Sequence, residues 1–325
     1  MRKSLLVITL FLLALSCKDE KSSNKRTLLD ATGNINEVSV VIENDLWNGN
    51  VGEAIRNVLA APVYGLPQDE PLFNINQIPT HVFSGFVTKN RTVLKIDEGK
   101  TAGITFNSDV YAKPQRVITI SGKTRQEIIS VLNENANKII ETFKNIELAY
   151  KQQRFKISLF KTDVFQKKLG LNINFPSAYR IAKDDNNFFW VRRDIETGSL
   201  NLMIYELPIS AIKRNDSIIS QIIKIRDSTA KKYIEGPVEG SYMTTENAYT
   251  PFNTETILDN KPTLETKGMW DIENAVMAGP FINYAIEDKI NKRWLVLEGF
   301  AFAPSVEKRD YMFELEAIIK TINIL

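Results

Sequence analysis

The chain has 325 residues, of which 43% are hydrophobic and 25% are charged, a composition typical of a globular protein with a sizeable core. Its 41 basic and 39 acidic residues leave a formal net charge of +2, which argues against a nucleic-acid-binding surface, because such surfaces are strongly basic. A single cysteine and a single histidine exclude disulfides within the chain and any metal site that needs two histidines.

The N-terminus has the pattern of a secretory signal peptide over residues 1–16. Arg2 and Lys3 precede an uncharged apolar run over residues 5–15, which is too short to span a bilayer, since spanning takes about 20 helical residues. The order Ala14-Leu15-Ser16-Cys17 resembles the bacterial lipobox, in which the cysteine is acylated and becomes the first residue of the mature protein. We therefore expect lipidation at Cys17 and anchoring in the outer membrane. The alternative is an ordinary secreted protein whose one cysteine falls there by chance.

Residues 17–36 are rich in Lys, Ser, Asn and Thr and are expected to form a flexible tether. Lys18, Asp19 and Glu20 resemble the signal that sends some Bacteroidota lipoproteins to the cell surface, although a solvated tether would have a similar composition. The periplasmic face and the cell surface therefore both stay open. Removing Arg2 and Lys3 with the signal peptide leaves 39 basic and 39 acidic residues, so the mature protein is formally neutral.

The first folded part is expected over residues 37–160. Residues 61–71 contain three prolines and a glycine and should be irregular. Apolar residues at three- and four-residue intervals predict one long amphipathic helix over 124–150. A second helix is expected over 51–60, and strands are expected over 37–42, 81–88, 91–96 and 116–120.

The second folded part is expected over residues 161–325. Its strands are predicted over 171–175, 188–193, 200–207, 275–286 and 293–303, and its helices over 209–233 and 306–322. This order predicts an α+β fold of two subdomains, each with a mainly antiparallel sheet and amphipathic helices packed on it. The second part resembles the PsbP/Mog1 type of α+β layer. Whether the two parts are a duplication stays open.

Residues 235–269 lack a clear pattern and predict a long loop, a kind of segment that is often functional or mobile. The aromatic residues Tyr242, Tyr249 and Phe252 lie in it, and Trp270 follows. Together with Trp47, which lies in an Asn-Gly turn, they are the candidate contacts for a partner or ligand. The alternative is a polar loop packed on the sheet.

Two local patterns that suggest catalysis have simpler interpretations. Ser121-Gly122-Lys123-Thr124 ends like a phosphate-binding loop, but the first glycine of that motif is replaced by Val117. Thr124 and Glu127 instead form a capping box at a helix start, so no nucleotide is expected. His81 has no partner histidine and no nucleophile motif near it. We therefore predict no catalytic residues, cofactor or metal. Two-carboxylate chemistry stays open, because acidic residues such as the pairs at 69–70 and 184–185 are abundant.

Several short motifs resemble a Bacteroidota lipoprotein family known only as a domain of unknown function. They are Leu46-Trp47-Asn48-Gly49, Val51-Gly52, Leu66-Pro67-Gln68, Glu70-Pro71-Leu72-Phe73 and Asn90-Arg91. The resemblance implies an envelope location but brings no activity and no functional residues. The leading hypothesis is a non-enzymatic binding or accessory subunit of a cell-envelope complex for transport, assembly or surface machinery. The alternative is a surface glycan-binding or glycan-cleaving lipoprotein.

Overall fold

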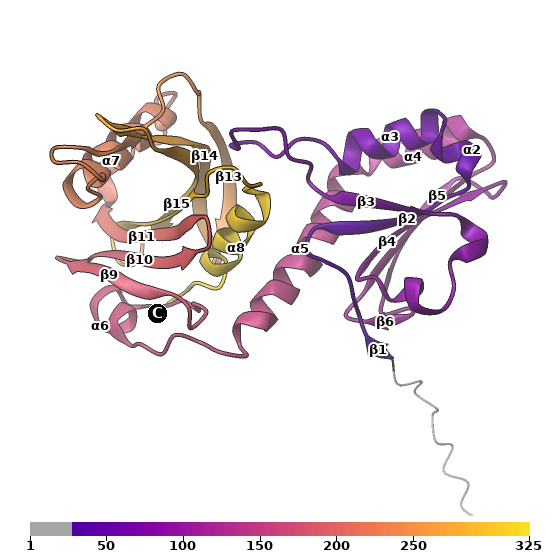
Figure 1. The fold of residues 1–325 in the computed structure, drawn as a ribbon, viewed down its shortest axis with the longest axis horizontal. Coiled ribbons are helices and arrows are strands. Elements are labelled where there is room, and N and C mark those ends of the chain that lie inside the picture. Colours follow the sequence, from indigo (N-terminus) through magenta and orange to yellow (C-terminus); the bar gives the residue numbers. More distant parts are fainter. Residues whose placement is uncertain (1–27) are drawn as a thin grey trace, which may run out of the picture.

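The computed structural model describes residues 28–325, so Cys17, Lys18, Asp19 and Glu20 lie outside the described part. Two α+β halves lie side by side, with the long helix α5 (Ala136–Phe155) running between them (Figure 1). Each half has its own sheet with helices packed on it, which confirms the predicted α+β class.

The N-terminal half is built on a five-stranded sheet in the order β3-β2-β4-β7-β5. Strands β3, β2, β4 and β7 are parallel neighbours, because the chain returns through helices and loops between them. Only β5 pairs antiparallel in this sheet, with β7. The N-terminal sheet is therefore an exception to the antiparallel pairing expected for both halves. The strands are β2 (Glu37–Val41), β3 (Asn74–Ile78), β4 (Thr92–Glu98), β5 (Gly103–Ser108) and β7 (Arg116–Gly122).

Four helices accompany this sheet: α2 (Asn44–Trp47), α3 (Asn50–Leu59), α4 (Arg125–Glu134) and α5. The single helix expected over 124–150 is wrong, because the chain breaks at Asn135. The Asn135 side chain donates to the carbonyl of Val131 at 2.8 Å and so competes with the helical backbone pattern. The predicted cap at its start is confirmed, since the Thr124 hydroxyl accepts from the amide of Glu127 at 3.2 Å.

The strand expected over 81–88 is also wrong. This segment forms two 3-10 turns, η1 (Thr80–Val82) and η2 (Gly85–Lys89), and His81 is exposed. Between the turns, Phe83 packs edge-on against Tyr111 and covers part of the second face of the sheet. Two short strands, β1 (Leu29–Asp30) and β6 (Ala112–Lys113), pair beside it.

The C-terminal half contains an eight-stranded antiparallel sheet in the order β12-β14-β15-β16-β11-β10-β9, with β13 also paired to β14. The loop expected over 235–269 is wrong, because it supplies β12, β13 and most of β14. Residues 253–256 of β13 are all polar, so this strand lacked the alternating apolar signal. The strands are β9 (Arg180–Asp185), β10 (Phe188–Ile195), β11 (Gly198–Pro208), β12 (Tyr242–Thr245), β13 (Phe252–Leu258), β14 (Lys261–Glu273), β15 (Ala278–Asp288) and β16 (Arg293–Phe302).

Helices α7 (Ile218–Tyr233) and α8 (Arg309–Ile319) cover opposite faces of this sheet. Successive strand residues point to opposite faces, so in β11 Leu202 packs on the α8 side and Met203 on the α7 side. The short elements η3 (Ile209–Ala211), α6 (Val164–Leu169), β8 (Leu171–Asn172) and β17 (Asn323–Ile324) complete the half. Among the helices of residues 28–325, none is long and apolar enough to cross a membrane.

Candidate functional site

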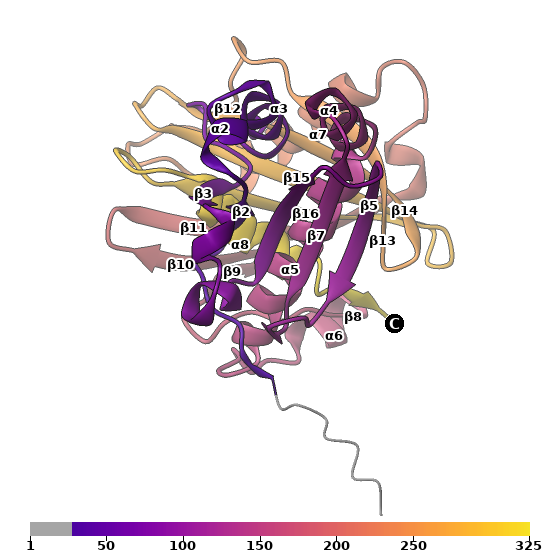
Figure 2. The same ribbon diagram turned by 90° about the vertical axis from the view of Figure 1, so that its right-hand side faces the viewer.

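Helix α5 belongs to the cores of both halves. Its first turns bury Ile139 and Phe143 in the N-terminal core, and its last turns bury Leu148 and Phe155 in the C-terminal core. A helix of 20 residues is about 30 Å long, which is long enough to serve two cores in succession. The two halves therefore share one continuous helix, which lies between their sheets (Figures 1 and 2).

Ion pairs join α5 to α8. Lys144 and Lys151 lie seven residues apart on one face of α5, where they pair with Glu316 at 2.7 Å and Glu314 at 2.9 Å on α8. All residues of α8 are buried except Asp310 and Tyr311, because the sheet covers one side of this helix and the N-terminal half lies near the other. The glutamates of α8 are therefore held inside the junction and not on an open surface.

A loop over residues 61–73 crosses from the N-terminal half to the C-terminal half. Its Glu70 carboxylate accepts hydrogen bonds from the backbone amides of Lys308 and Arg309, each at 2.7 Å, at the start of α8. These amides are unpaired donors at a helix N-terminus, so Glu70 caps a helix of the other half. The loop also runs close to β14: at Gly65, where φ is +86°, an added Cβ would lie 2.9 Å from that of Lys267.

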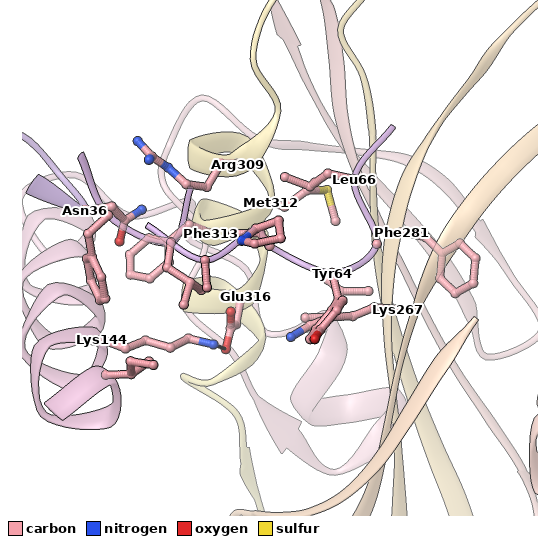
Figure 3. A pocket seen from close by; sticks show the side chains of 18 of the residues that line it. Asn36, Tyr64, Leu66, Lys144, Lys267, Phe281, Arg309, Met312, Phe313 and Glu316 are labelled. Carbon is pink, nitrogen blue, oxygen red and sulfur yellow. Dashed lines mark ion pairs between the residues drawn. The ribbon is translucent and has the colours of Figure 1, made fainter. Parts of the chain in front are cut away.

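This crossing loop, α5, α8 and the C-terminal sheet line a partly open cavity of about 370 Å³, which we call the junction cavity (Figure 3). Its walls are mainly apolar, and the volume lies within the range of small-molecule sites, about 300–1,000 Å³. Of the charged side chains in its lining, Lys144, Lys267 and Arg309 are cationic and Glu316 is anionic. The apolar lining includes Val63, Tyr64, Leu66, Leu72, Phe73, Ile140, Phe281, Ile282, Met312 and Phe313.

Glu316 is surrounded by lysine side chains at this cavity. Its Oε1 lies 2.7 Å from the ammonium groups of both Lys144 and Lys320, while Lys267 pairs with Glu265 at 2.7 Å. In Figure 3, Lys144 and Lys267 approach Glu316 from opposite sides. Burial alone would raise the pKa of Glu316, but the surrounding lysines outweigh it and hold that pKa well below its usual range.

Burial and neighbouring charges also have opposite effects on the pKa of Lys267. Burial works to lower its pKa, but the charges of Glu316 and Glu265 outweigh this effect and raise it. Both Glu316 and Lys267 therefore keep their charge near neutral pH. A general acid or base works best when its pKa lies near the working pH, so these side chains are suited to holding a ligand rather than to moving protons.

Two of the predicted contact residues, Tyr249 and Phe252, pack against the crossing loop. The hydroxyl of Tyr249 accepts from the amide of Gly65 at 3.1 Å, and the ring of Phe252 lies 4.4 Å from that of Tyr64. Both residues thus hold the crossing loop on the C-terminal half. Trp270 was expected to offer contact surface, but its side chain is only 2% exposed in β14, and its Nε1 donates to the carbonyl of Ala301 at 3.2 Å.

The remaining predicted contacts lie elsewhere. Tyr242 is half-buried in β12 beside Lys231, and Trp47 is half-buried under the guanidinium of Arg56, 4.6 Å from the ring centroid. Neither lines the junction cavity, and their roles as partner contacts stay predictions. Trp294 is buried and Trp190 is half-buried, so two of the four tryptophans are buried in the core and two are partly accessible.

Sequence patterns gave no prediction for the charged residues of the junction, namely Lys144, Lys267, Glu316 and the cap Glu70. One signal could have found part of this set. The predicted terminal helix places Glu314 and Glu316 among apolar neighbours, and acidic residues in such a run are seldom buried without a cationic partner.

The acidic groups of α8 make the stability of the junction depend on pH. Glu314 accepts from the hydroxyl of Tyr179 at 2.9 Å and pairs with Lys151 and Arg193. Burial works to raise its pKa, but the two cations outweigh burial and lower that pKa. A lowered folded-state pKa contributes stability that is full above the unfolded value, near 4.5, and is lost as pH falls below it.

We therefore expect Glu314→Gln to be destabilising at pH 7 and progressively less so, relative to wild type, below about pH 4.5. Urea unfolding of both proteins between pH 3 and pH 7 measures this difference. A difference that stays constant over the range would contradict the ionic role of Glu314.

The fold and this cavity define a two-part α+β protein with a mainly apolar cavity at the junction of its halves. Two family models match the chain, and both are described as domains of unknown function: DUF4837 over residues 158–321 and DUF8532 over residues 31–156. The chain belongs to the DUF4837 family, which confirms the expected kind of family; the assignment to Bacteroidota stays a prediction. A search of curated proteins gave no match.

Among solved structures, the chain is similar to the Ran-binding protein Mog1p of Saccharomyces cerevisiae. The TM-score is 0.31 at 7% sequence identity, and the match covers 48% of this chain and 90% of Mog1p.

Proposed function

We propose that this chain is a lipid-anchored binding protein of the cell envelope that holds an amphipathic, anionic small molecule in the junction cavity. The observation that carries the proposal is the cavity itself, which elements of both halves line. Its apolar lining suits a hydrocarbon portion of the ligand. Three cationic side chains line the cavity, each already paired with a carboxylate of this chain, and an acidic head group would share these cations.

The chemistry at the cavity favours binding over turnover. Glu316 and Lys267 are held in their charged forms by one another and by their neighbours. Since neither can readily exchange a proton near neutral pH, their contribution is electrostatic.

The cellular setting of the proposal comes from the sequence. A lipobox-like Cys17 and a formally neutral mature chain fit an outer-membrane lipoprotein that serves as an accessory subunit of an envelope complex. Metabolic labelling with an alkyne analogue of palmitate tests the anchor: label should enter the wild type and be absent from Cys17→Ser. Purification in mild detergent tests the complex, and recovery of the protein alone as a monomer would count against an accessory role.

Titration with dodecanoate tests the cavity. We expect dodecanoate to bind the wild-type protein in isothermal titration calorimetry, and the cationic dodecyltrimethylammonium to bind at least tenfold more weakly. Ile140→Trp adds a large ring to the cavity wall and should weaken dodecanoate binding at least tenfold. The matched control is Ile129→Trp: Ile129 is also partly buried against the N-terminal core but does not line the cavity.

Each comparison has an outcome that counts against the proposal. Equal dodecanoate affinity in Ile140→Trp and Ile129→Trp would place binding outside the cavity. Equal affinity for the anionic and cationic detergents would remove the role of the lysines. A wild-type protein that binds neither would contradict the proposed ligand.

A further inference from the structure

Five exposed apolar side chains gather on three neighbouring segments at one end of the N-terminal half, residues 29–32, 80–90 and 109–113. Phe86 is 69% exposed, which is unusual for an aromatic side chain that projects from a turn. We call this group the end patch; its members are Leu29, Val82, Phe86, Val87 and Val110.

The end patch rests on a well-bonded backbone. Gln115 is fully buried and joins two of the segments: its Nε2 donates to the carbonyls of Thr88 and Asn90 at 2.7 and 2.8 Å, and its Oε1 accepts from the amide of Tyr111 at 2.8 Å. Beneath the patch, Phe83 packs edge-on against Tyr111 with ring centroids 5.5 Å apart. The exposed side chains are therefore held in place rather than carried on a loose loop.

The third segment is the start of the described chain. The amide of Ala31 donates to the carbonyl of Lys113, and that of Thr32 to the carbonyl of Lys89, each at 2.9 Å. The chain thus enters the fold between the two segments that carry the rest of the patch, beside β1 and β6 (Figure 1). Leu29 itself is 59% exposed there.

The position of Cys17 indicates what the patch faces. Cys17 precedes residue 28 by eleven positions, and a chain of that length can span at most about 40 Å. A lipid on Cys17 therefore keeps residue 28, where the chain enters this end of the N-terminal half, within about 40 Å of the bilayer. From this arrangement we propose that the end patch is a membrane-contact surface, with Phe86 and its valine neighbours seated in the interfacial region of the bilayer; the proposal rests on the lipid anchor of the proposed function.

The charges around the patch fit such a contact. The Lys89 ammonium lies 5.5 Å from the Phe86 ring, and a lysine beside an apolar group can extend its charged end to the headgroups. Lys113 lies 4.0 Å from Asp109, and Asp30 is also exposed nearby. Because these acids offset the two lysines, the contact depends on apolar burial and does not require anionic lipid.

Site-specific fluorescence on vesicles tests the contact. A decahistidine tag replaces residues 1–17 and tethers the folded chain to phosphatidylcholine vesicles through a nickel-chelating lipid. A cysteine introduced as Val87→Cys then carries the only thiol, and it is labelled with an environment-sensitive nitrobenzoxadiazole dye. Ile290→Cys is the matched control, since Ile290 is 83% exposed in a turn of the C-terminal half.

We expect brominated lipids to quench the dye at position 87 at least threefold more than the dye at position 290. Adding Phe86→Ser should reduce quenching at position 87 by at least half. Equal quenching at both positions, or none at position 87, overturns the membrane contact. The tag replaces the acyl chain, so this result does not depend on native acylation, whose failure would appear separately as loss of palmitate labelling at Cys17.

Discussion

Replacing Arg91 by Met is expected to lower the free energy of unfolding by about 3–5 kcal/mol, because it leaves the Glu147 carboxyl buried without its cation. The guanidinium contacts both Glu147 oxygens at 2.8 and 2.9 Å, and it stacks 3.8 Å from the centroid of the Tyr150 ring. Arg91 is 1% exposed and Glu147 is fully buried. Burial is complete enough to raise the pKa of Glu147 despite its hydrogen bonds to Arg91.

Chemical denaturation checks this prediction, with Arg180→Met as the control. Arg180 pairs with Asp194, but both side chains are more than half exposed, so that variant should lose no more than about 1 kcal/mol. The double variant Arg91→Met/Glu147→Leu removes both charges and should recover most of the lost stability. A loss below 1 kcal/mol in Arg91→Met alone would show that the pair is not structural.

Glu316→Gln should have the second largest effect, a loss of about 2–4 kcal/mol. The substitution keeps the shape of the side chain but removes the negative charge that faces Lys144, Lys267 and Lys320. The loss should be smaller than for Arg91→Met, because Lys144 and Lys320 are each 29% exposed and can reach water.

The control for this variant is Glu307→Gln, an exposed position just before α8, which should change stability by no more than about 0.5 kcal/mol. Unfolding curves of the two variants and the wild type at pH 7 make the comparison. If Glu316→Gln and Glu307→Gln were equally stable, the charge cluster would not hold the junction together.

Much of the architecture was predictable from local patterns. Runs of apolar and aromatic residues correctly indicated β10, β11, β15 and β16, and Thr124 with Glu127 correctly marked the start of α4. The errors arose where tertiary contacts decide the structure. Strand β13 is polar and is stabilised by its pairing with β14. Residues 80–89 form turns in which Phe83 packs against Tyr111, a residue distant in the chain.

The junction cavity could not be predicted in the same way. Its residues come from Asn36, the crossing loop, α5, β14, β15 and α8, and the first and last of them, Asn36 and Glu316, lie 280 positions apart in the chain. In the sequence Glu70 is one of an adjacent acidic pair in an irregular segment, but in the structure it is 4% exposed and caps α8. The prolines around it gave no sign that this loop reaches the other half, because that contact depends on how the two sheets are placed by α5.

The most direct test of the account is to identify what the junction cavity holds in the cell. We would extract three proteins, the wild type, Ile140→Trp and Ile129→Trp, from the membranes of the cells that produce them. A membrane-extracting polymer replaces detergent, so that no detergent molecule can occupy the cavity. Mass spectrometry of organic extracts would then compare the co-purifying small molecules. We expect an acidic amphipathic compound, near one per protein, in the wild type and in Ile129→Trp, and its loss from Ile140→Trp. The same compounds in the same amounts from all three proteins would contradict it.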